Sequence, residues 1–551
     1  MGIRQKAARL IMTHVSDRAW DDFGDECRRL ERDVEELGVG GFCLFGGNVD
    51  RTPGLIASMR ELAPHRLLVA SDLERGAGQQ LEGATVFPSL MMCGATGDSK
   101  LAFAQGCVTA VEARAAGINL VFAPVADVHT EDTNPIIGVR AFGSEPDMVA
   151  EFVTAFVRGL ERAGVAGTVK HFPGHGDTRR DSHIELPVVD VDRAMLESRE
   201  YVPFRAAFGE GVQAVMTAHV EYPALDEGPA TLSRTVMTDL LRTELGFNGL
   251  VVTDALLMGG IAELHGPGEA AVRALEAGVD VLLMPADAEA AIQGIVDAVD
   301  SGRLAEDRLD DSVARIEKLL DWSEACPMPA PPYDVLPREL ADTLRCHLDG
   351  TEDDLWGESR SRVAGEIARL GVTWLRGDPP AAAAGLTSSD PASVALVAIH
   401  EVGEFDNFIW LRSEFEAAFP GGRFASACVP VESGGKENGE EGSRESELCT
   451  ADADGQMEEI LAIAAASSHC IIALFDEVTA WKGHAGFADP ARRLVASIVE
   501  VAPRATALLF AAPWHADAAA GSDAVLCCWD GSRPAQLAAL GALLGGRLDR
   551  S

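Results

Sequence analysis

The sequence predicts an α/β protein, in which a (β/α)8 TIM-like barrel is followed by a smaller α/β sandwich domain. Short apolar runs recur between residues 41 and 284 with helix-like stretches between them, and this alternation is typical of a parallel sheet covered by helices. Seven or eight such units in about 300 residues fit a barrel, with a doubly wound open sheet as the alternative. The full length of 551 residues leaves room for a second domain.

The expected barrel strands are strongly apolar segments, many of them rich in β-branched residues, and helix-like stretches such as 147–163 separate them. After the last of them, apolar residues recur at helical spacing from Leu309 to Leu320 and predict an amphipathic helix that closes the first domain. Seven segments are predicted as barrel strands: Gly41–Phe45, Leu67–Ala70, Asn119–Ala123, Ala166–Val169, Gln213–Thr217, Gly249–Thr253 and Asp280–Met284.

A proline-rich segment at 326–333 marks the expected boundary between the domains, because proline interrupts both helices and sheet interiors. We therefore predict a barrel over residues 1–322 and a linker with a helical segment over 323–390, the helix running from about 337 to 375. Residues 391–551 are expected to form the α/β sandwich domain.

The second domain shows fewer buried-strand patterns than the first. A polar, glycine-containing stretch at Glu432–Glu447 separates the first two of them and is expected to be a solvated loop. The predicted strands are Ser393–Ile399, Cys470–Phe475, Thr506–Ala511 and Ala524–Cys528.

Charge and composition exclude several classes of partner. The formal net charge is −40, which makes nucleic acids and anionic membranes poor partners. Uninterrupted apolar runs of 18 residues are absent, and the N-terminus lacks the apolar core of a signal peptide, so we expect a cytoplasmic protein. The eleven scattered cysteines have no zinc-ligand spacing and are expected to be free thiols in a reducing compartment. The oligomeric state is not predicted.

Polar residues follow several of the predicted strands at the point where each strand ends. The strand ends of a parallel barrel share one face, where active sites lie, so these side chains are expected to meet there. Any one of the carboxylates could equally be a helix N-cap, and the prediction therefore depends on the whole set. The set comprises Asp72, Lys170 with His171, His219 and Asp254.

The densest cluster, Lys170–His183, has three histidines, one lysine and two aspartates in fourteen residues. One interpretation is acid/base chemistry on a polyhydroxylated substrate, with Asp181 and His183 as a carboxylate–imidazole pair. The other is a metal site, but Lys170 would repel a cation and the spacing matches no standard zinc motif, so we predict no metal. Dinucleotide, P-loop and nucleophile-elbow motifs are absent, and no cofactor is predicted. The metal set would be His171, His175, Asp177, Asp181 and His183.

This cluster resembles the KHFPGHGDT…DSH signature of bacterial β-N-acetylglucosaminidases in glycoside hydrolase family 3. The resemblance covers about residues 4–320, and the second half resembles two-domain members only in layout. The loop after Asp72 departs from the commoner Gln-Glu-Gly-Gly-Arg form, and Ala255 replaces a frequent second aspartate. Further segments that fit in order are Gly38–Asn48, Ser71–Gln80, Gly117–Val128, Asn134–Pro146, Ala214–Asp226, Pro229–Ser233 and Gly246–Met258.

The resemblance implies a retaining exo-β-N-acetylglucosaminidase whose partner is an N-acetylglucosamine-containing glycoside. It implies that Asp254 is the nucleophile and that His183, paired with Asp181, is the general acid/base. A β-glucosidase or β-xylosidase of the same family and a non-enzymatic sugar-binding protein are the alternatives. Because a histidine acid/base does not repel an anion, phosphate could replace water as acceptor, approaching beside Arg179 and Arg180. The implied substrate-binding residues are Asp72, Arg140, Lys170, His171 and, near the site, His219.

Overall fold

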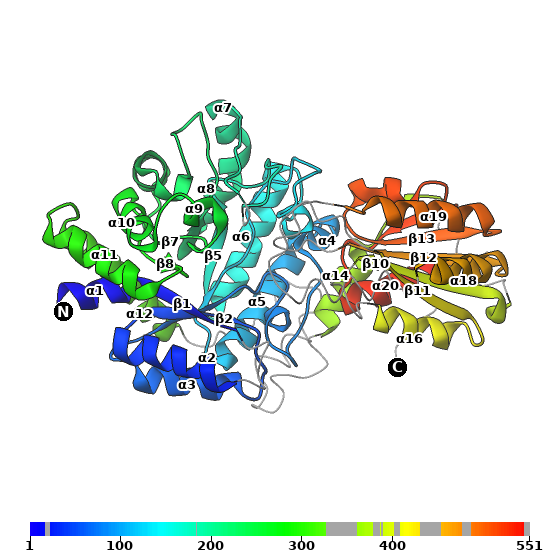
Figure 1. Cartoon of the computed structure of the whole chain (residues 1–551), viewed down its shortest axis with the longest axis horizontal. Helices are drawn as coiled ribbons and strands as arrows, with labels where there is room; N and C mark the ends of the chain where they lie inside the picture. The colour runs from blue at the N-terminus through cyan, green and yellow to red at the C-terminus, as the bar shows by residue number, and fades with distance from the viewer. Residues whose placement is uncertain are drawn as a thin grey trace. The chain divides into compact units, whose positions relative to one another are not determined.

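The computed structural model forms two compact units, Met1–Leu90 with Asp98–Val363 and Met91–Gly97 with Ala364–Ser551 (Figure 1). The residues that the structure describes are 1–16, 23–182, 185–326, 361–377, 386, 390–401, 408–429, 453–476 and 486–544.

The first unit contains eight parallel strands in the order β7-β6-β5-β4-β3-β2-β1-β8. A parallel bridge between Val252 and Val281 joins β7 to the start of β8, so the sheet curls into a barrel rather than an open sheet. The barrel prediction is therefore confirmed over the doubly wound alternative. The strands are β1 (Ile11–Ser16), β2 (Gly41–Phe45), β3 (Leu68–Ser71), β4 (Leu120–Val121), β5 (Ala166–Phe172), β6 (Ala214–Thr217), β7 (Leu250–Val252) and β8 (Leu282–Leu283).

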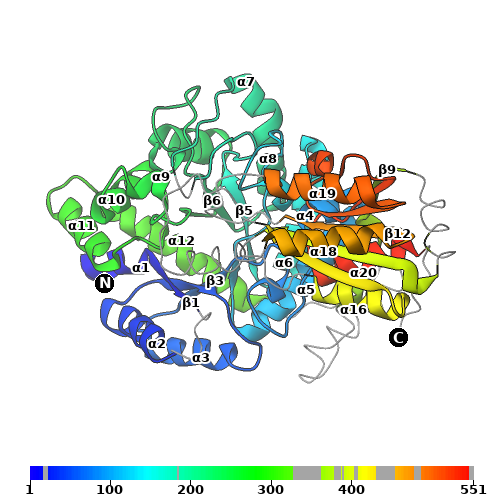
Figure 2. The same cartoon turned by 45° about the vertical axis from the view of Figure 1, so that its right-hand side comes forward.

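Helices cover the outside of this barrel (Figures 1 and 2). Helix α6 begins with Pro146, which suits the first turn, and buries the apolar face that includes Phe152 and Phe156. The predicted face of α12 from Leu309 to Leu320 is buried as expected. The main α-helices are α1 (Ile3–Arg9), α2 (Phe23–Arg32), α3 (Thr52–Leu62), α5 (Ser99–Ala116), α6 (Pro146–Arg162), α8 (Tyr201–Glu210), α10 (Pro267–Ala277), α11 (Ala288–Asp300) and α12 (Glu306–Ala325).

Short α-helices, 3-10 turns and π-helical segments occupy several of the connections around this unit. They are η2 (Asp33–Leu37), η3 (Ala77–Gln79), η4 (Gly138–Arg140), α7 (Arg193–Met195), η5 (Leu196–Glu200), η6 (Ala230–Leu232), η7 (Thr235–Glu244) and α9 (Gly259–Ala262), whereas all but the first residue of α4 (Leu90–Ala95) belongs to the second unit. The π-helical segments among them are η2, η5 and η7.

All seven predicted barrel strands are found, but the sequence analysis missed β1. This strand lies between β2 and β8, and its Ile11 and Met12 are fully buried. Thr13 and His14 interrupt its apolar pattern, and barrel closure rather than local composition places it in the sheet. The predicted strand β5 is also longer than expected and runs on through Lys170 and His171 to Phe172.

The second unit has a six-stranded sheet in the order β11-β10-β12-β13-β14-β9, parallel except for β9, which pairs antiparallel with β14. One apolar core contains residues of α18 and α19, and the other contains residues of α16 and α20, so helices cover both faces of the sheet. The predicted α/β sandwich is confirmed. The strands are β9 (Thr373–Arg376), β10 (Val394–Glu401), β11 (Arg423–Val429), β12 (His469–Phe475), β13 (Ala505–Phe510) and β14 (Ala524–Cys527).

The helices of this unit are α14 (Ser361–Gly371), α16 (Ile409–Ala418), α18 (Ala453–Ala465), α19 (Asp489–Val501) and α20 (Arg533–Leu543), with short turns η10 (Pro391–Ser393) and η11 (Pro513–Ala519). The four predicted strands of this domain are found, whereas β9 and β11 were not predicted. The expected helix to residue 375 is wrong at its end, because Thr373–Arg376 pairs with β14 as a strand.

Several sequence predictions fall on residues that the structure does not describe. Residues 327–360 of the predicted linker and the whole Glu432–Glu447 loop lie outside the described residues, and the domain boundaries at 322 and 390 stay predictions. Cys428 is disulfide-bonded, which corrects the expectation that every cysteine is free, although eight others are free thiols. None of the helices in the described ranges combines the length and apolarity that a bilayer span requires.

Candidate active site

The predicted site residues that the structure describes lie at the carboxyl ends of the barrel strands or in the connections that follow them. Asp72 directly follows β3, Lys170 and His171 lie in the last part of β5, and Asp254 comes two residues after β7. Arg140 ends the 3-10 turn η4 in the connection between β4 and α6. This common placement is the geometry of barrel active sites.

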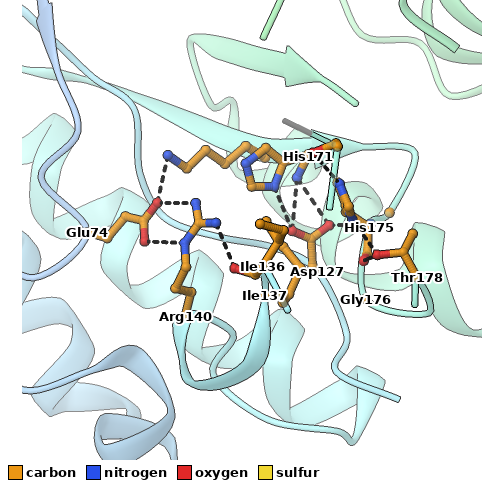
Figure 3. A network of polar contacts seen from close by, with 12 residues as sticks. Glu74, Asp127, Ile136, Ile137, Arg140, His171, His175, Gly176 and Thr178 are labelled. Carbon is orange, nitrogen blue, oxygen red and sulfur yellow. Dashed lines mark hydrogen bonds and ion pairs between the residues drawn. The ribbon is translucent and has the colours of Figure 1, made fainter. Parts of the chain in front are cut away.

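Two cations and two carboxylates form the first part of the site, and Figure 3 shows the pairing of Glu74 with Arg140 within it. The Nζ atom of Lys170, a residue that is 2% exposed, lies 2.7 Å from Asp72 Oδ1 and 2.7 Å from Glu74 Oε1. Arg140 binds Glu74 through two nitrogens, with Nε 3.0 Å from Oε2 and Nη2 2.7 Å from Oε1. A buried lysine is stable in its charged form only with such partners.

The same contacts determine the ionisation of this group. Burial alone would raise the pKa of Glu74, but Arg140 and Lys170 together hold that pKa well below its usual range. Burial would likewise lower the pKa of Lys170, but Asp72 and Glu74 raise it above the ordinary value. Glu74 is therefore anionic and Lys170 cationic at neutral pH.

The second part of the site is organised by Asp127, a completely buried carboxylate after β4 (Figure 3). Its Oδ2 lies 2.8 Å from His171 Nδ1, and its Oδ1 accepts the backbone N–H groups of His175 at 2.6 Å and His171 at 3.2 Å. Burial alone would raise the pKa of Asp127, but the neighbouring His171, its hydrogen bond and the hydrogen bond from the His175 backbone lower it. One carboxylate thus orients both the His171 ring and the turn that follows it.

His175 links two residues of the loop that follows β5 through its two ring nitrogens. Its Nδ1 lies 2.8 Å from Thr178 Oγ1 and its Nε2 lies 3.1 Å from Ser182 Oγ. Burial and the neighbouring His171 lower the pKa of His175 to about 4, partly opposed by Asp127 and Asp254. A neutral imidazole therefore bridges two hydroxyls of the loop at ordinary pH.

The predicted acid/base pair is only partly within the described residues. Asp181 is 3% exposed and lies in this loop, directly before the Ser182 that His175 contacts. His183 lies outside the described residues, so its pairing with Asp181 stays a prediction.

Asp254 and His219 come from neighbouring strands. Asp254 Oδ1 accepts the backbone N–H of Ala255 at 2.8 Å, a contact that orients the carboxylate at the end of β7. His219 places Nε2 3.1 Å from the Ala255 carbonyl and Nδ1 2.8 Å from Thr231 Oγ1. His219 therefore holds the segment that carries Asp254.

Sequence reasoning missed Glu74 and Asp127. Both follow a strand, which is the signal that identified Asp72, and both lie within segments that carry the family resemblance. Both residues matter because of the groups that they pair with. Glu74 forms ion pairs with Lys170 and Arg140, and Asp127 contacts the ring nitrogen Nδ1 of His171. Those pairings became visible only with the fold.

The alternative metal set is not brought together in the described part of the chain. Asp177 instead pairs with Arg199 at 2.7 Å, and His171 and His175 use their Nδ1 atoms on protein partners. Among the residues described, no group of three or more His, Cys, Asp or Glu side chains could hold a metal ion.

The fold and the site together define a barrel protein whose strand ends present paired carboxylates, cations and imidazoles to a polar ligand. Residues 2–319, more than half of the chain, match the model described as "Glycosyl hydrolase family 3 N terminal domain". The chain belongs to glycosyl hydrolase family 3, as the resemblance implied.

Individual relatives agree with this assignment. The chain is 38% identical over 325 residues to "Beta-hexosaminidase A" of Pseudoalteromonas piscicida, a match that covers 52% of this chain and 54% of that protein. It is 38% identical over 270 residues to a "Beta-hexosaminidase" of Chromobacterium violaceum, covering 47% of this chain and 75% of the relative. The chain thus spans about half the length of the Pseudoalteromonas relative.

A solved structure matches both units of the chain. It is described as a glycoside hydrolase family 3 β-N-acetylglucosaminidase from Paenibacillus sp. str. FPU-7, and it superposes with a TM-score of 0.79 at 29% identity. The match covers 99% of this chain and 97% of that one, so the order of barrel and sandwich is shared.

Proposed function

We propose that the chain is a retaining exo-β-N-acetylglucosaminidase, which removes terminal β-linked N-acetylglucosamine from glycosides. The observation that carries the proposal is the position of Asp254 on the same barrel face as the Lys170, Arg140 and His171 cluster. The names of the relatives, β-hexosaminidases and a β-N-acetylglucosaminidase, support the choice of sugar.

The proposed reaction has two steps. In the first, an Asp254 oxygen bonds to the anomeric carbon while the glycosidic bond breaks, and the leaving-group oxygen takes a proton from His183. In the second, a water oxygen attacks the anomeric carbon, its proton passes to His183, and the bond to Asp254 breaks. Asp181 would orient His183 in both steps.

The sugar hydroxyls would be held by the charged group around Lys170. Asp72 has 28% of its side chain exposed against 6% for Glu74, so Asp72 is the carboxylate that a sugar can reach. Glu74 instead forms ion pairs with Lys170 and Arg140. Lys170 and Arg140 can only donate hydrogen bonds to the sugar hydroxyls. The same hydroxyls would donate their own protons in hydrogen bonds to Asp72 and His171.

A more specific proposal is that phosphate replaces water as the acceptor in the second step. Arg179 and Arg180 are exposed and paired with Glu131 at 2.6 Å and Glu185 at 2.7 Å, so they offer phosphate little free charge. The proposal therefore depends on the histidine acid/base, which does not repel an anion. Product analysis at constant ionic strength tests it: N-acetylglucosamine 1-phosphate supports phosphate transfer, and free sugar alone at a phosphate-independent rate identifies a plain hydrolase.

The substrate proposal is tested with p-nitrophenyl β-glycosides of N-acetylglucosamine, glucose and xylose, using Asp254→Ala as the blank. We expect the N-acetylglucosaminide to have the highest kcat/KM by at least about tenfold, since the site would recognise the acetamido group. Preference for the glucoside or xyloside would favour the alternative glycosidase activities. Binding of the sugars without turnover of any of them would indicate a sugar-binding protein.

A further inference from the structure

Asp127 contacts three groups of the segment that carries His171, which are the His171 ring and the backbone N–H groups of His171 and His175. The carboxylate is 0% exposed, and its Oδ2 lies 2.8 Å from His171 Nδ1 (Figure 3). Its Oδ1 is already engaged by two backbone N–H groups, those of His175 at 2.6 Å and His171 at 3.2 Å. Oδ2 faces the ring and also lies 3.3 Å from the His171 backbone nitrogen, whereas the His175 N–H is accepted by Oδ1.

The chemistry of the carboxylate decides where the ring proton lies. An ionised carboxylate has no proton to donate, so the ring nitrogen that it contacts must carry one. That nitrogen is Nδ1, which leaves Nε2 as the ring nitrogen without a protein partner among the described residues. A histidine whose Nδ1 is held in this way presents Nε2 outward.

We infer that Asp127 is a positioning residue for the sugar subsite, which fixes His171 in its Nδ1–H form and so makes neutral Nε2 a hydrogen-bond acceptor for a sugar hydroxyl. This inference rests on the proposed function. The adjacent Lys170 and Arg140 can only donate, so an acceptor beside them completes the pairing of a hydroxyl, which both donates and accepts. The subsite should therefore bind a sugar with a hydroxyl at this position better than the corresponding deoxy sugar.

The variant Asp127→Asn separates this role from a structural one. Its amide oxygen can take the place of Oδ1 and still accept the two backbone N–H groups, which leaves the amide nitrogen facing His171 Nδ1. Because that nitrogen donates, neutral His171 must switch to the Nε2–H form and lose its acceptor. We expect kcat/KM to fall about 10- to 100-fold.

The tautomer is read directly by 15N NMR of histidine-labelled protein, with the His171 signals assigned from a His171→Gln variant. The wild-type ring should be protonated at Nδ1, and Asp127→Asn should move the proton to Nε2. A wild-type ring protonated only at Nε2 would overturn the inference, even if the variant failed to fold. This readout needs no activity, so an inactive protein with the expected tautomer would contradict the proposed function alone.

Kinetics in a second background tests whether Asp127 acts through His171. In a His171→Ala protein, adding Asp127→Asn should lower kcat/KM less than threefold, because the residue it positions is gone. A full 10- to 100-fold loss there would show a structural role and contradict the inference. Asp280→Asn is the matched control: Asp280 is also 0% exposed and accepts a backbone N–H, but at the opposite end of the barrel strands. Its folded fraction should retain near-normal kcat/KM.

Discussion

Replacing Glu74 with glutamine tests whether one buried carboxylate holds the cationic half of the site together. Glu74 accepts hydrogen bonds from three cationic nitrogens, Lys170 Nζ, Arg140 Nε and Arg140 Nη2, at 2.7 to 3.0 Å. Glutamine keeps the shape but removes the charge and turns one acceptor into a donor. The variant therefore leaves Lys170 with Asp72 alone and Arg140 without its bidentate partner.

The size of the effect follows from burial. Breaking a buried ion pair by removing one partner costs about 3–5 kcal/mol, and the Glu74 side chain is only 6% exposed. We expect Glu74→Gln to lower the free energy of unfolding by about 3 kcal/mol at pH 7 and kcat/KM by at least tenfold. The pKa of Glu74 is lowered by folding, so its contribution is complete above the unfolded pKa and is lost as pH falls through the folded pKa.

The assay is urea unfolding of both proteins between pH 3 and pH 8. Glu269→Gln is the matched control, because Glu269 also pairs with two cations, Arg273 and Arg303, but has 36% of its side chain exposed. That surface variant should lose at most about 1 kcal/mol. Equal losses for the two variants, or a Glu74→Gln protein with wild-type kcat/KM, would refute the reasoning.

Three further outcomes follow from the same structure. His183→Ala should impair natural glycosides far more than activated aryl glycosides, because a good leaving group needs little protonation; equal losses on both would exclude His183 as the acid. Burial raises the pKa of Glu200 to about 7 against the opposing charge of Arg199, so folded Glu200 binds its proton more tightly than unfolded Glu200, and the contribution of Glu200 to stability falls as pH rises toward 7. Urea unfolding should show Glu200→Gln gaining roughly 3 kcal/mol over the wild type between pH 4 and pH 8, and a constant difference would contradict this. Dialysis against EDTA should leave turnover unchanged, whereas loss of activity restored by zinc would revive the metal interpretation.

The fold could be predicted from sequence where local patterns and global structure agree. Buried parallel strands read as continuous apolar runs, as in Gln213–Thr217, and the barrel followed from their number and spacing. Strand β1 escaped because Thr13 and His14 are polar, although Thr13 is buried by its neighbours in the closed barrel. The antiparallel edge strand β9 escaped because nothing local distinguishes it from the end of α14.

The site, like the fold, could be predicted from the sequence only in part. Residues at strand ends were found because the barrel topology gives them one shared face. Glu74 joins Lys170 to Arg140 there, and Asp72 pairs with Lys170. Partners that neutralise buried charge, Glu74 and Asp127, were not found, since pairing is a property of three-dimensional contact.

Trapping the glycosyl-enzyme tests the central claim, that Asp254 is the nucleophile of a retaining glycosidase, most directly. A fluorinated N-acetylglucosaminyl fluoride that slows the second step should inactivate the enzyme and leave one sugar covalently attached. Mass spectrometry of the digested protein should place that sugar on Asp254, and Asp254→Ala should remain unlabelled. A wild-type enzyme that turns over substrate but carries the sugar on another residue, or never forms an adduct, would contradict the account.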